Sequence, residues 1–348
     1  MFAQCWGVPE DRIPEKKPSR IWVLLLNWGG FVKFSHTLFA LPFALAAMAL
    51  AARANFFQLK AAGEAPADSL LRGWPGWRVF LLIVAAMVTA RTCAMAFNRI
   101  VDRDFDAANP RTRKRHLPAG RISLFSAWTL TILSAAAFLA TCWFLPRICF
   151  YLAPVALFLV FFYSLTKRFS DFTHAFLGLA LAVAPVGAWL AVTGEVQFIA
   201  PGVEGFMDKI RHGFFTPLVL ALLVLLWLIG FDIIYSIQDY EFDRDHKLHS
   251  LAVRWGPTNA LQASLLAHML MYGVLVFFGL ACGFMLPYWI GLAIIMGCLG
   301  LEHWIVRKRS IEWAEKSFFR LNALIGIIFL TVVIAEVAFP DFWSFRGR

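Results

Sequence analysis

The chain has 348 residues, of which 60% are hydrophobic and only 16% are charged. Soluble proteins hold about 45–50% apolar and about 25% charged residues, so this composition excludes a soluble fold, a disordered chain and a coiled coil. A protein that crosses a membrane several times remains. The net charge of +10 then fits basic loops beside a membrane, and no nucleic-acid partner is expected.

Apolar runs of the length needed to cross the hydrocarbon layer, about 17–25 residues, recur along the whole chain. They lie at 34–52, 79–97, 122–146, 148–166, 175–194 and 213–231, then at 255–301, which a break at Gly283–Pro287 divides in two, and finally at 321–335 with extensions at both ends. The runs are continuous rather than alternating, so they predict helices and not barrel strands. We therefore expect an all-α polytopic membrane protein with nine spanning helices.

Charge distribution predicts the orientation of these nine spans. Lys and Arg are concentrated on the side that holds the N-terminus and the loops after the second, fourth, sixth and eighth spans. The positive-inside rule places this side in the cytoplasm, in a bacterial-type inner membrane. A polar tail is expected at 1–20 and a membrane domain at 21–348, with insertions on the opposite side at about 55–77 and 197–212.

Two acidic clusters follow the second and sixth spans, on the same predicted side of the membrane. The first cluster holds Asn98, Asp102 and Asp106, and the second holds Asp232, Asp239 and Asp243. If the helices continue, the members of each cluster share one helical face, because their spacings are close to whole turns. The two acidic faces are then expected to converge over one cavity.

Carboxylates one turn apart repel each other, so this arrangement predicts a cation between them. Mg²⁺ suits the site, because it keeps several waters and binds a few carboxylates together with substrate phosphates. Basic residues near the clusters are expected to neutralise diphosphate oxygens; they are Arg111, Arg113, Lys114, Lys167, Arg244 and Lys247. Three further acids, Asp104, Glu241 and Asp245, fall off the shared faces and are expected to be solvated.

These residues resemble the motifs of the UbiA family of intramembrane aromatic prenyltransferases. The family pattern N-x-x-x-D-x-x-x-D matches at 98–106, and N-P-R-T followed by L-P-A-G matches at 109–120. The pattern D-x-x-Y-x-x-x-D-x-x-x-D matches at 232–243, and Y-x-x-x-K matches Tyr163 and Lys167. The resemblance covers nearly the whole chain, apart from the first 20 or so residues and the two insertions.

The resemblance implies nine helices in a ring around a central cavity, capped by cytoplasmic loops. It also implies a reaction in which a polyprenyl diphosphate ionises and its allylic cation is attacked by an aromatic acid, with two Mg²⁺ ions as cofactors. The metal ligands implied are Asn98, Asp102, Asp106, Asp239 and Asp243. Asn98 and Lys167 are implied to contact the diphosphate, and Tyr163 the forming cation. Asp102 and Asp239 are taken as essential for catalysis, and Asp232 and Tyr235 as part of the substrate cavity.

The segment after the second acidic motif departs from the family pattern. Enzymes of ubiquinone formation read roughly K-x-G-x-K-S there, whereas this chain reads D-H-K-L-H-S at 245–250. This variant is similar to relatives linked to menaquinone formation. The acceptor is therefore left open between 4-hydroxybenzoate, as in ubiquinone biosynthesis, and a dihydroxynaphthoate.

Arg91 is a cation in the middle of the second span, where charges are costly and usually face a cavity. Its position two turns before Asn98 favours a cavity role, such as binding an acceptor carboxylate, while helix–helix pairing is the alternative. Ion-coupled transport is a rival function for the whole chain. Transporters, however, place their acids near the bilayer midplane within internal repeats, and the sequence shows neither. A non-catalytic scaffold would not require the acidic clusters, and no protein partner is inferred.

Overall fold

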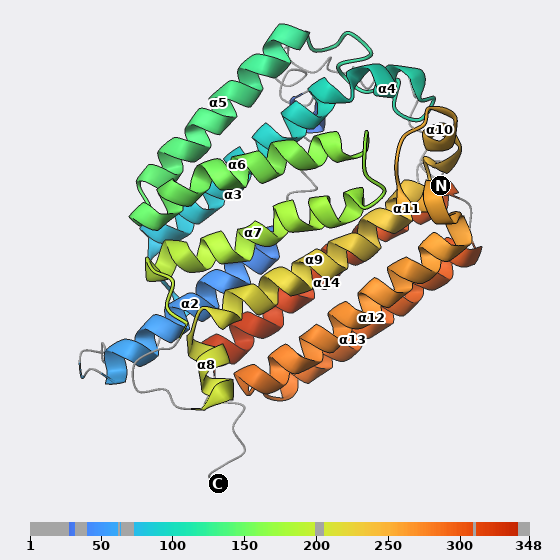
Figure 1. Cartoon of the computed structure of the whole chain (residues 1–348). Coiled ribbons are helices and arrows are strands. Elements are labelled where there is room, and N and C mark those ends of the chain that lie inside the picture. The colour runs from blue at the N-terminus through green and yellow to red at the C-terminus, as the bar shows by residue number, and fades with distance from the viewer. Residues whose placement is uncertain are drawn as a thin grey trace, which may run out of the picture.

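The computed structural model describes residues 28–31, 40–61, 63, 73–198, 205–308 and 311–339. Every regular element within these ranges is a helix, and the long helices lie side by side in a tilted bundle (Figure 1). The long helices are α2 (Leu41–Ala61), α3 (Trp77–Val101), α5 (Leu124–Trp143), α6 (Arg147–Thr166), α7 (Thr173–Thr193), α9 (Phe215–Ile237), α12 (Pro257–Cys282), α13 (Leu286–Lys308) and α14 (Ile311–Ala338). The short helices are α4 (Arg103–Ala108), α8 (Phe206–His212), α10 (Tyr240–Asp245) and α11 (Leu251–Trp255). The all-α fold is confirmed.

Eight of the described helices are long and apolar enough to cross a membrane, namely α3, α5, α6, α7, α9, α12, α13 and α14. Helix α2 is a ninth long helix that does not reach the same apolar content, because Arg53, Asn55, Gln58 and Lys60 lie in its second half. The chain is therefore a polytopic membrane protein, and the number of nine spans stays a prediction.

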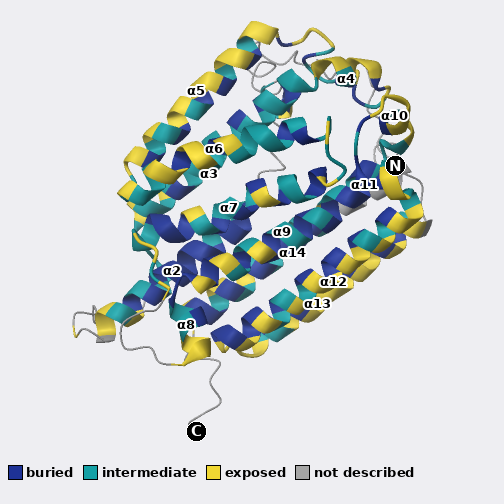
Figure 2. Ribbon diagram, viewed as in Figure 1, coloured by how far each residue is buried: buried dark blue, intermediate teal, exposed yellow. Residues whose placement is uncertain are grey.

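Helix α2 lies at the centre of the packing, against α7 and α14 (Figure 2). Its alanines Ala44, Ala46, Ala47 and Ala51 are fully buried. Small side chains let helix backbones approach closely inside a membrane. The alanine-rich first half of α2 therefore packs closely against its neighbouring helices.

The helix ends follow local signals in the sequence. Gly283 adopts a left-handed conformation with φ of +63°, which ends α12 and divides the long apolar run where the sequence predicted a break. Ser123 caps the start of α5 by accepting a hydrogen bond from the Ser126 backbone amide. The short helices α4, α10 and α11 lie together at one end of the bundle, opposite α8 (Figure 1).

The predicted insertions are partly helical. Helix α2 continues to Ala61, so the first seven residues of the expected 55–77 insertion extend a long helix. The expected 197–212 insertion contains α8. The predicted tail at 1–20 lies outside the described residues.

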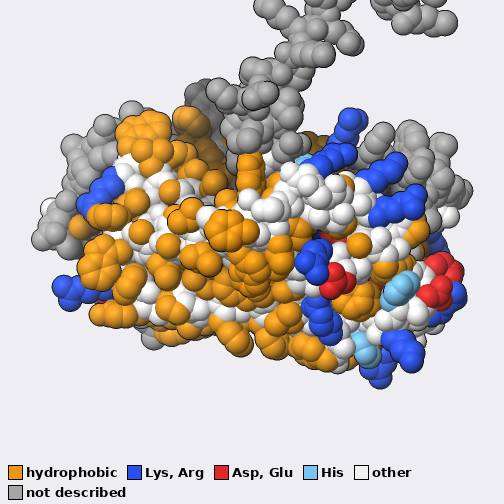
Figure 3. Space-filling model, turned by 90° about the horizontal axis from the view of Figure 1, so that it is seen from above, with side chains coloured by type: hydrophobic (Ala, Val, Ile, Leu, Met, Phe, Trp, Pro, Cys, Tyr) orange, Lys and Arg blue, Asp and Glu red, His pale blue; other side chains and the backbone are white. Residues whose placement is uncertain are grey.

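The surface divides by polarity as a membrane protein requires. Figure 3 shows a broad apolar face and a gathering of charged side chains toward one end of the molecule. Helices α4 and α10 lie at that end (Figure 1), with exposed charges that include Asp104, Glu241 and Arg244. The apolar face is suited to lipid, and the charged end to water and headgroups.

Candidate active site

A cavity of about 460 Å³ lies inside the bundle between α3, α6, α7 and α9. Away from the charged end its walls carry small apolar side chains, among them Ala86, Ala90, Ala156 and Ala184. At the charged end the walls become polar and include both acidic clusters. The convergence expected from the sequence is therefore observed: two acidic clusters far apart in the chain line one cavity.

The first acidic cluster lies where α3 gives way to α4. Asp102 is the single residue between the two helices, with φ −92° and ψ 6°. Asn98 donates from Nδ2 to Asp102 Oδ2 at 3.0 Å, and Arg168 Nη2 lies 3.2 Å from Asp102 Oδ1. One turn further on, Asp106 is buried and pairs with Arg115 Nη1 at 2.6 Å. Each carboxylate of this cluster thus has a cationic partner from another part of the chain.

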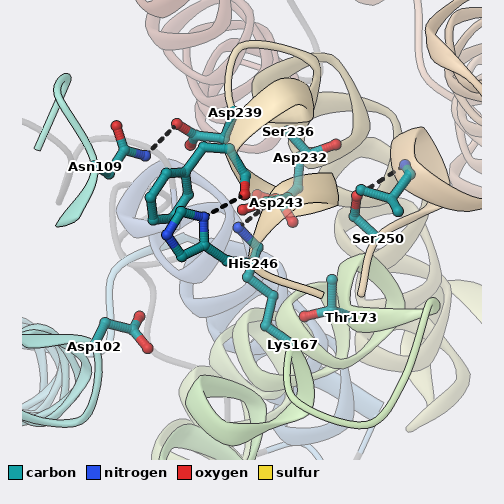
Figure 4. Close-up of polar contacts among 12 residues, drawn as sticks. Asp102, Asn109, Lys167, Thr173, Asp232, Ser236, Asp239, Asp243, His246 and Ser250 are labelled. Atoms are coloured by element: carbon teal, nitrogen blue, oxygen red, sulfur yellow. Dashed lines mark hydrogen bonds and ion pairs between the residues drawn. The ribbon is translucent and has the colours of Figure 1, made fainter. Parts of the chain in front are cut away.

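The second cluster lies where α9 gives way to α10. Asp239 accepts hydrogen bonds from Asn109 Nδ2 and Arg111 Nε, each at 3.0 Å, and its other oxygen also contacts Arg111. Asn109 and Arg111 belong to the loop that follows the first cluster, so this loop joins the two clusters. Asp243 is almost fully buried and pairs with Lys167 Nζ at 2.8 Å. Figure 4 shows Asp102 on a different element from Asp239, Asp243 and Lys167.

The cations at the cavity differ in part from those predicted. Lys167 and Arg111 contact the acidic clusters as expected, whereas Arg113, Lys114 and Lys247 are exposed and do not line the cavity. Arg99, Arg115 and Arg168 line it instead. Sequence reasoning missed these three; the only available signal was their nearness to the motif residues. Asp104, Glu241 and Asp245 are exposed, as predicted.

Burial and ion pairing set the protonation of the groups at the charged end. Burial alone would raise the pKa of Asp239, but the Arg111 guanidinium, helped by Lys167 and Asn109, outweighs it and lowers the pKa. Burial raises the pKa of Asp102, and Arg168 offsets only part of this effect. The Asp243 carboxylate outweighs burial at Lys167 and raises the pKa of the ammonium group. Asp239 and Lys167 therefore stay charged at neutral pH.

The donor set at this end fits a magnesium ion that also binds substrate. Within the part of the chain that the structure describes, no three Asp, Glu, His or Cys side chains are grouped to hold an ion alone. Mg²⁺ does not need such a cage, because one or two carboxylates suffice when waters and phosphates complete its octahedron. The Oδ2 atom of Asp106 is buried and accepts no hydrogen bond. Asp106 Oδ2 can therefore serve as an oxygen ligand of a metal ion.

Four predicted cavity residues lie on the cavity wall. Arg91 and Tyr163 line it from α3 and α6, and Asp232 and Tyr235 line it from α9. The Nε atom of Arg91 is buried without a hydrogen-bond partner. Tyr235 accepts a hydrogen bond from Arg111 Nη1 at 3.0 Å, and the guanidinium lies 5.1 Å from the centre of its ring.

Membrane-crossing helices around a cavity with a charged end and an apolar depth define a membrane enzyme for substrates with a polar head and an apolar tail. The model of the UbiA prenyltransferase family matches residues 69–324. The chain belongs to this family and is a membrane prenyltransferase.

Relatives of known name and structure agree with this assignment. A 4-hydroxybenzoate octaprenyltransferase from Nitrosospira multiformis is 30% identical over 263 residues, which cover 75% of this chain and 84% of the relative. The corresponding protein of Cupriavidus necator is 27% identical over 263 residues, covering 76% and 86%. The apo structure of a UbiA homologue from Aeropyrum pernix K1 is 29% identical with a TM-score of 0.69, covering 86% of this chain and 98% of that one.

A more distant structure shares the fold. It is a UbiA homologue from Archaeoglobus fulgidus bound to GPP and Mg²⁺, 18% identical with a TM-score of 0.59, covering 88% of this chain and 99% of that one. At this level of identity the likeness concerns the arrangement of helices alone.

Proposed function

We propose that this prenyltransferase moves a polyprenyl group from a polyprenyl diphosphate to an aromatic acid, with 4-hydroxybenzoate as the acceptor. The observation that carries the proposal is the single cavity in which two acidic clusters and their cations lead into an apolar depth. A diphosphate needs the charged end, and a prenyl tail needs the apolar walls. The relatives named 4-hydroxybenzoate octaprenyltransferase support the choice of acceptor.

 We propose Mg²⁺ as the cofactor of this transfer. The oxygen ligands proposed for it are Asn98, Asp102, Asp106, Asp239 and Asp243. When bound, the metal would neutralise the charge that develops on the leaving diphosphate. Solved relatives bound to Mg²⁺ with a prenyl diphosphate support this choice of cofactor.

The cations that pair with the acidic clusters are suited to exchange partners on substrate binding. Arg111, Arg115, Lys167 and Arg168 each lie against a carboxylate in this structure. Diphosphate oxygens can take over these cations, because phosphate accepts charge-assisted hydrogen bonds as a carboxylate does. The freed carboxylates then become available as metal ligands. In this way the same side chains neutralise the site both with and without substrate.

The deeper part of the cavity is suited to the allylic cation and the acceptor. Tyr163 lines the wall one turn before Lys167, where an aromatic ring can stabilise a cation. Arg91 has no carboxylate partner among the described residues and is proposed to bind the carboxylate of the acceptor. The apolar walls keep water from the cation. We place the charged end of the cavity at the cytoplasmic face, following the distribution of basic residues.

An in vitro transfer assay tests this function. The purified protein in liposomes is offered polyprenyl diphosphates of several lengths with either 4-hydroxybenzoate or a dihydroxynaphthoate, with and without Mg²⁺. We expect Mg²⁺-dependent formation of prenylated hydroxybenzoate. Preference for the naphthoate would favour the alternative role in menaquinone formation. Ion flux across the liposomes with no prenylated product would contradict the proposal.

A further inference from the structure

A histidine–aspartate pair lies in the cavity wall and has been given no step of the reaction so far. His174, the second residue of α7, is buried, and its Nδ1 lies 2.7 Å from Asp232 Oδ2 on α9. The backbone amide of Leu251, the first residue of α11, donates a long hydrogen bond of 3.4 Å to His174 Nε2. Three elements distant in sequence are joined through one imidazole.

The Leu251 amide fixes the tautomer of His174. A backbone N–H can only donate, so Nε2 must carry a lone pair. The ring proton therefore lies on Nδ1 and is donated to Asp232 Oδ2. This arrangement holds the carboxylate in one orientation with a neutral partner.

Asp232 differs in this respect from the four other carboxylates at the charged end. Asp102, Asp106, Asp239 and Asp243 are each paired with Arg or Lys. Within the described ranges, Asp232 makes its ion-pair contact with His174 alone, and its Oδ1 accepts no hydrogen bond. Its side chain remains 21% exposed and lines the cavity. One oxygen of Asp232 is thus held and the other is free to act.

The position of Asp232 along α9 matches that of Arg91 along α3. Asp232 precedes Asp239 by seven residues, and Arg91 precedes Asn98 by the same number. Two helical turns amount to about 10 Å, and residues seven apart share a face. Asp232 therefore lies about 10 Å deeper than Asp239, and Arg91 about 10 Å deeper than Asn98, on the wall of the same cavity. An acceptor whose carboxylate binds Arg91 would have its ring at the depth of Asp232.

We propose that Asp232 is the proton acceptor of the reaction and that His174 is its positioning residue; the inference rests on the proposed function. When the prenyl carbon bonds to the ring, the attacked ring carbon carries both the new substituent and its hydrogen. The C–H bond then breaks, and its electron pair restores the aromatic ring. The proton passes to Asp232 Oδ1, which forms a neutral carboxyl group and later releases the proton to water at the charged end.

Substitution of Asp232 combined with an isotope effect tests the proposal. Asp232→Asn keeps the size of the side chain and removes its basicity. We expect kcat to fall by about 10²–10⁴-fold, the usual contribution of a general base, with little change in KM for the prenyl diphosphate. We also expect proton removal to become rate-limiting, so that an acceptor deuterated at the attacked carbon reacts more slowly than the ordinary acceptor.

A second pair of variants tests the role of His174. The amide of His174→Gln can donate to Asp232 and accept from Leu251, whereas His174→Leu can do neither. We expect the leucine variant to lose rate and to show the isotope effect of Asp232→Asn, and the glutamine variant to recover most of the rate. Equal rates in the two variants would contradict a positioning role. Mg²⁺-dependent binding of the prenyl diphosphate verifies that each variant is folded.

The outcomes separate this inference from the proposed function. Wild-type protein that prenylates no aromatic acid would contradict the function itself. An active wild type with an Asp232→Asn variant of unchanged kcat would contradict only the role of Asp232. A large loss without an isotope effect, accompanied by a raised KM for the prenyl diphosphate, would also overturn it and would assign Asp232 to diphosphate binding.

Discussion

Asp102 and Asp239 occupy equivalent breaks in two different parts of the chain. Asp102 has φ −92° and ψ 6° between α3 and α4, and Asp239 has φ −103° and ψ 8° between α9 and α10. In both places a long helix ends and a short helix of six residues begins. The aspartate four residues later, Asp106 or Asp243, is buried. The two motifs therefore share a local geometry, in which a break in the helix turns the last carboxylate inward.

The equivalence predicts that the aspartates at both breaks are needed for catalysis. Asp102→Asn and Asp239→Asn each remove a charge without changing side-chain volume. We expect each to lower prenyl transfer at least about a hundredfold, as is typical when an electrostatic contact at the reacting centre is lost. Asp104→Asn is the matched control, because Asp104 lies beside Asp102 in sequence but its side chain is 85% exposed. Most of the activity remaining in either test variant, while it stays folded in detergent, would refute the two-cluster site.

The raised pKa of Asp102 predicts a link between pH and magnesium. Burial is the main cause of the raised pKa, and a protonated carboxyl does not ligate a metal. Protons therefore compete with Mg²⁺ at a higher pH than the usual aspartate pKa of about 3.9 would allow. We expect prenyl transfer to fall as the pH is lowered, and the acidic limb to move to lower pH at saturating Mg²⁺. Rate profiles at low and high Mg²⁺ measure this, and an acidic limb that does not move would count against Mg²⁺ binding at Asp102.

The depth of the cavity at Gly187 is predicted to limit the length of the prenyl chain that the enzyme accepts. Gly187 lines the cavity on α7, and a Cβ added there meets no atom within 4 Å. It lies about 20 Å along α7 from His174, far from the charged end. We expect Gly187→Phe to fill the cavity and to reject the longest polyprenyl diphosphates while short ones still react. Gly187→Ala is the control, since a methyl group fits the open space. An equal loss at every chain length in Gly187→Phe would argue that the tail lies elsewhere.

Much of this architecture can be predicted from the sequence, because a chain that crosses lipid must form long apolar helices. Continuous apolar runs predicted the helices, and Gly283 predicted the break between α12 and α13. The shared face of Asn98, Asp102 and Asp106 was correct in direction, although the helix breaks at Asp102 instead of continuing. Spacing predicts which face a residue occupies, but a break between two helices depends on tertiary contacts that spacing does not describe.

The choice among basic residues was less predictable for the same reason. Arg113 and Arg115 lie two positions apart in one loop, yet Arg113 is exposed and Arg115 pairs with Asp106. Lys167 and Arg168 are neighbours, and they contact different acidic clusters. The fold of an irregular loop decides such details, and no periodicity in the sequence describes it. The His174–Asp232 pair likewise depends on how α7 packs against α9.

Glu336 is predicted to stabilise the folded protein at a place far from the cavity. This buried carboxylate on α14 accepts hydrogen bonds at Oε1 from the backbone amides of Met285 and Tyr288, at 2.9 and 3.2 Å. It thereby satisfies amides at the start of α13, which have no partner within the helix. Glu336→Leu leaves both donors without this acceptor, and the amide of the buried Tyr288 then stays unpaired at a cost of about 1–3 kcal/mol, whereas Glu336→Gln keeps an acceptor oxygen.

We therefore expect a lower melting temperature in detergent for Glu336→Leu and a nearly unchanged one for Glu336→Gln. Both variants should keep the parental rate of prenyl transfer well below their melting temperatures, because Glu336 does not line the cavity. Equal melting temperatures for the two variants would show that the amides of Met285 and Tyr288 do not depend on this carboxylate. A loss of rate without a loss of stability would instead tie the junction of α12 and α13 to the reaction.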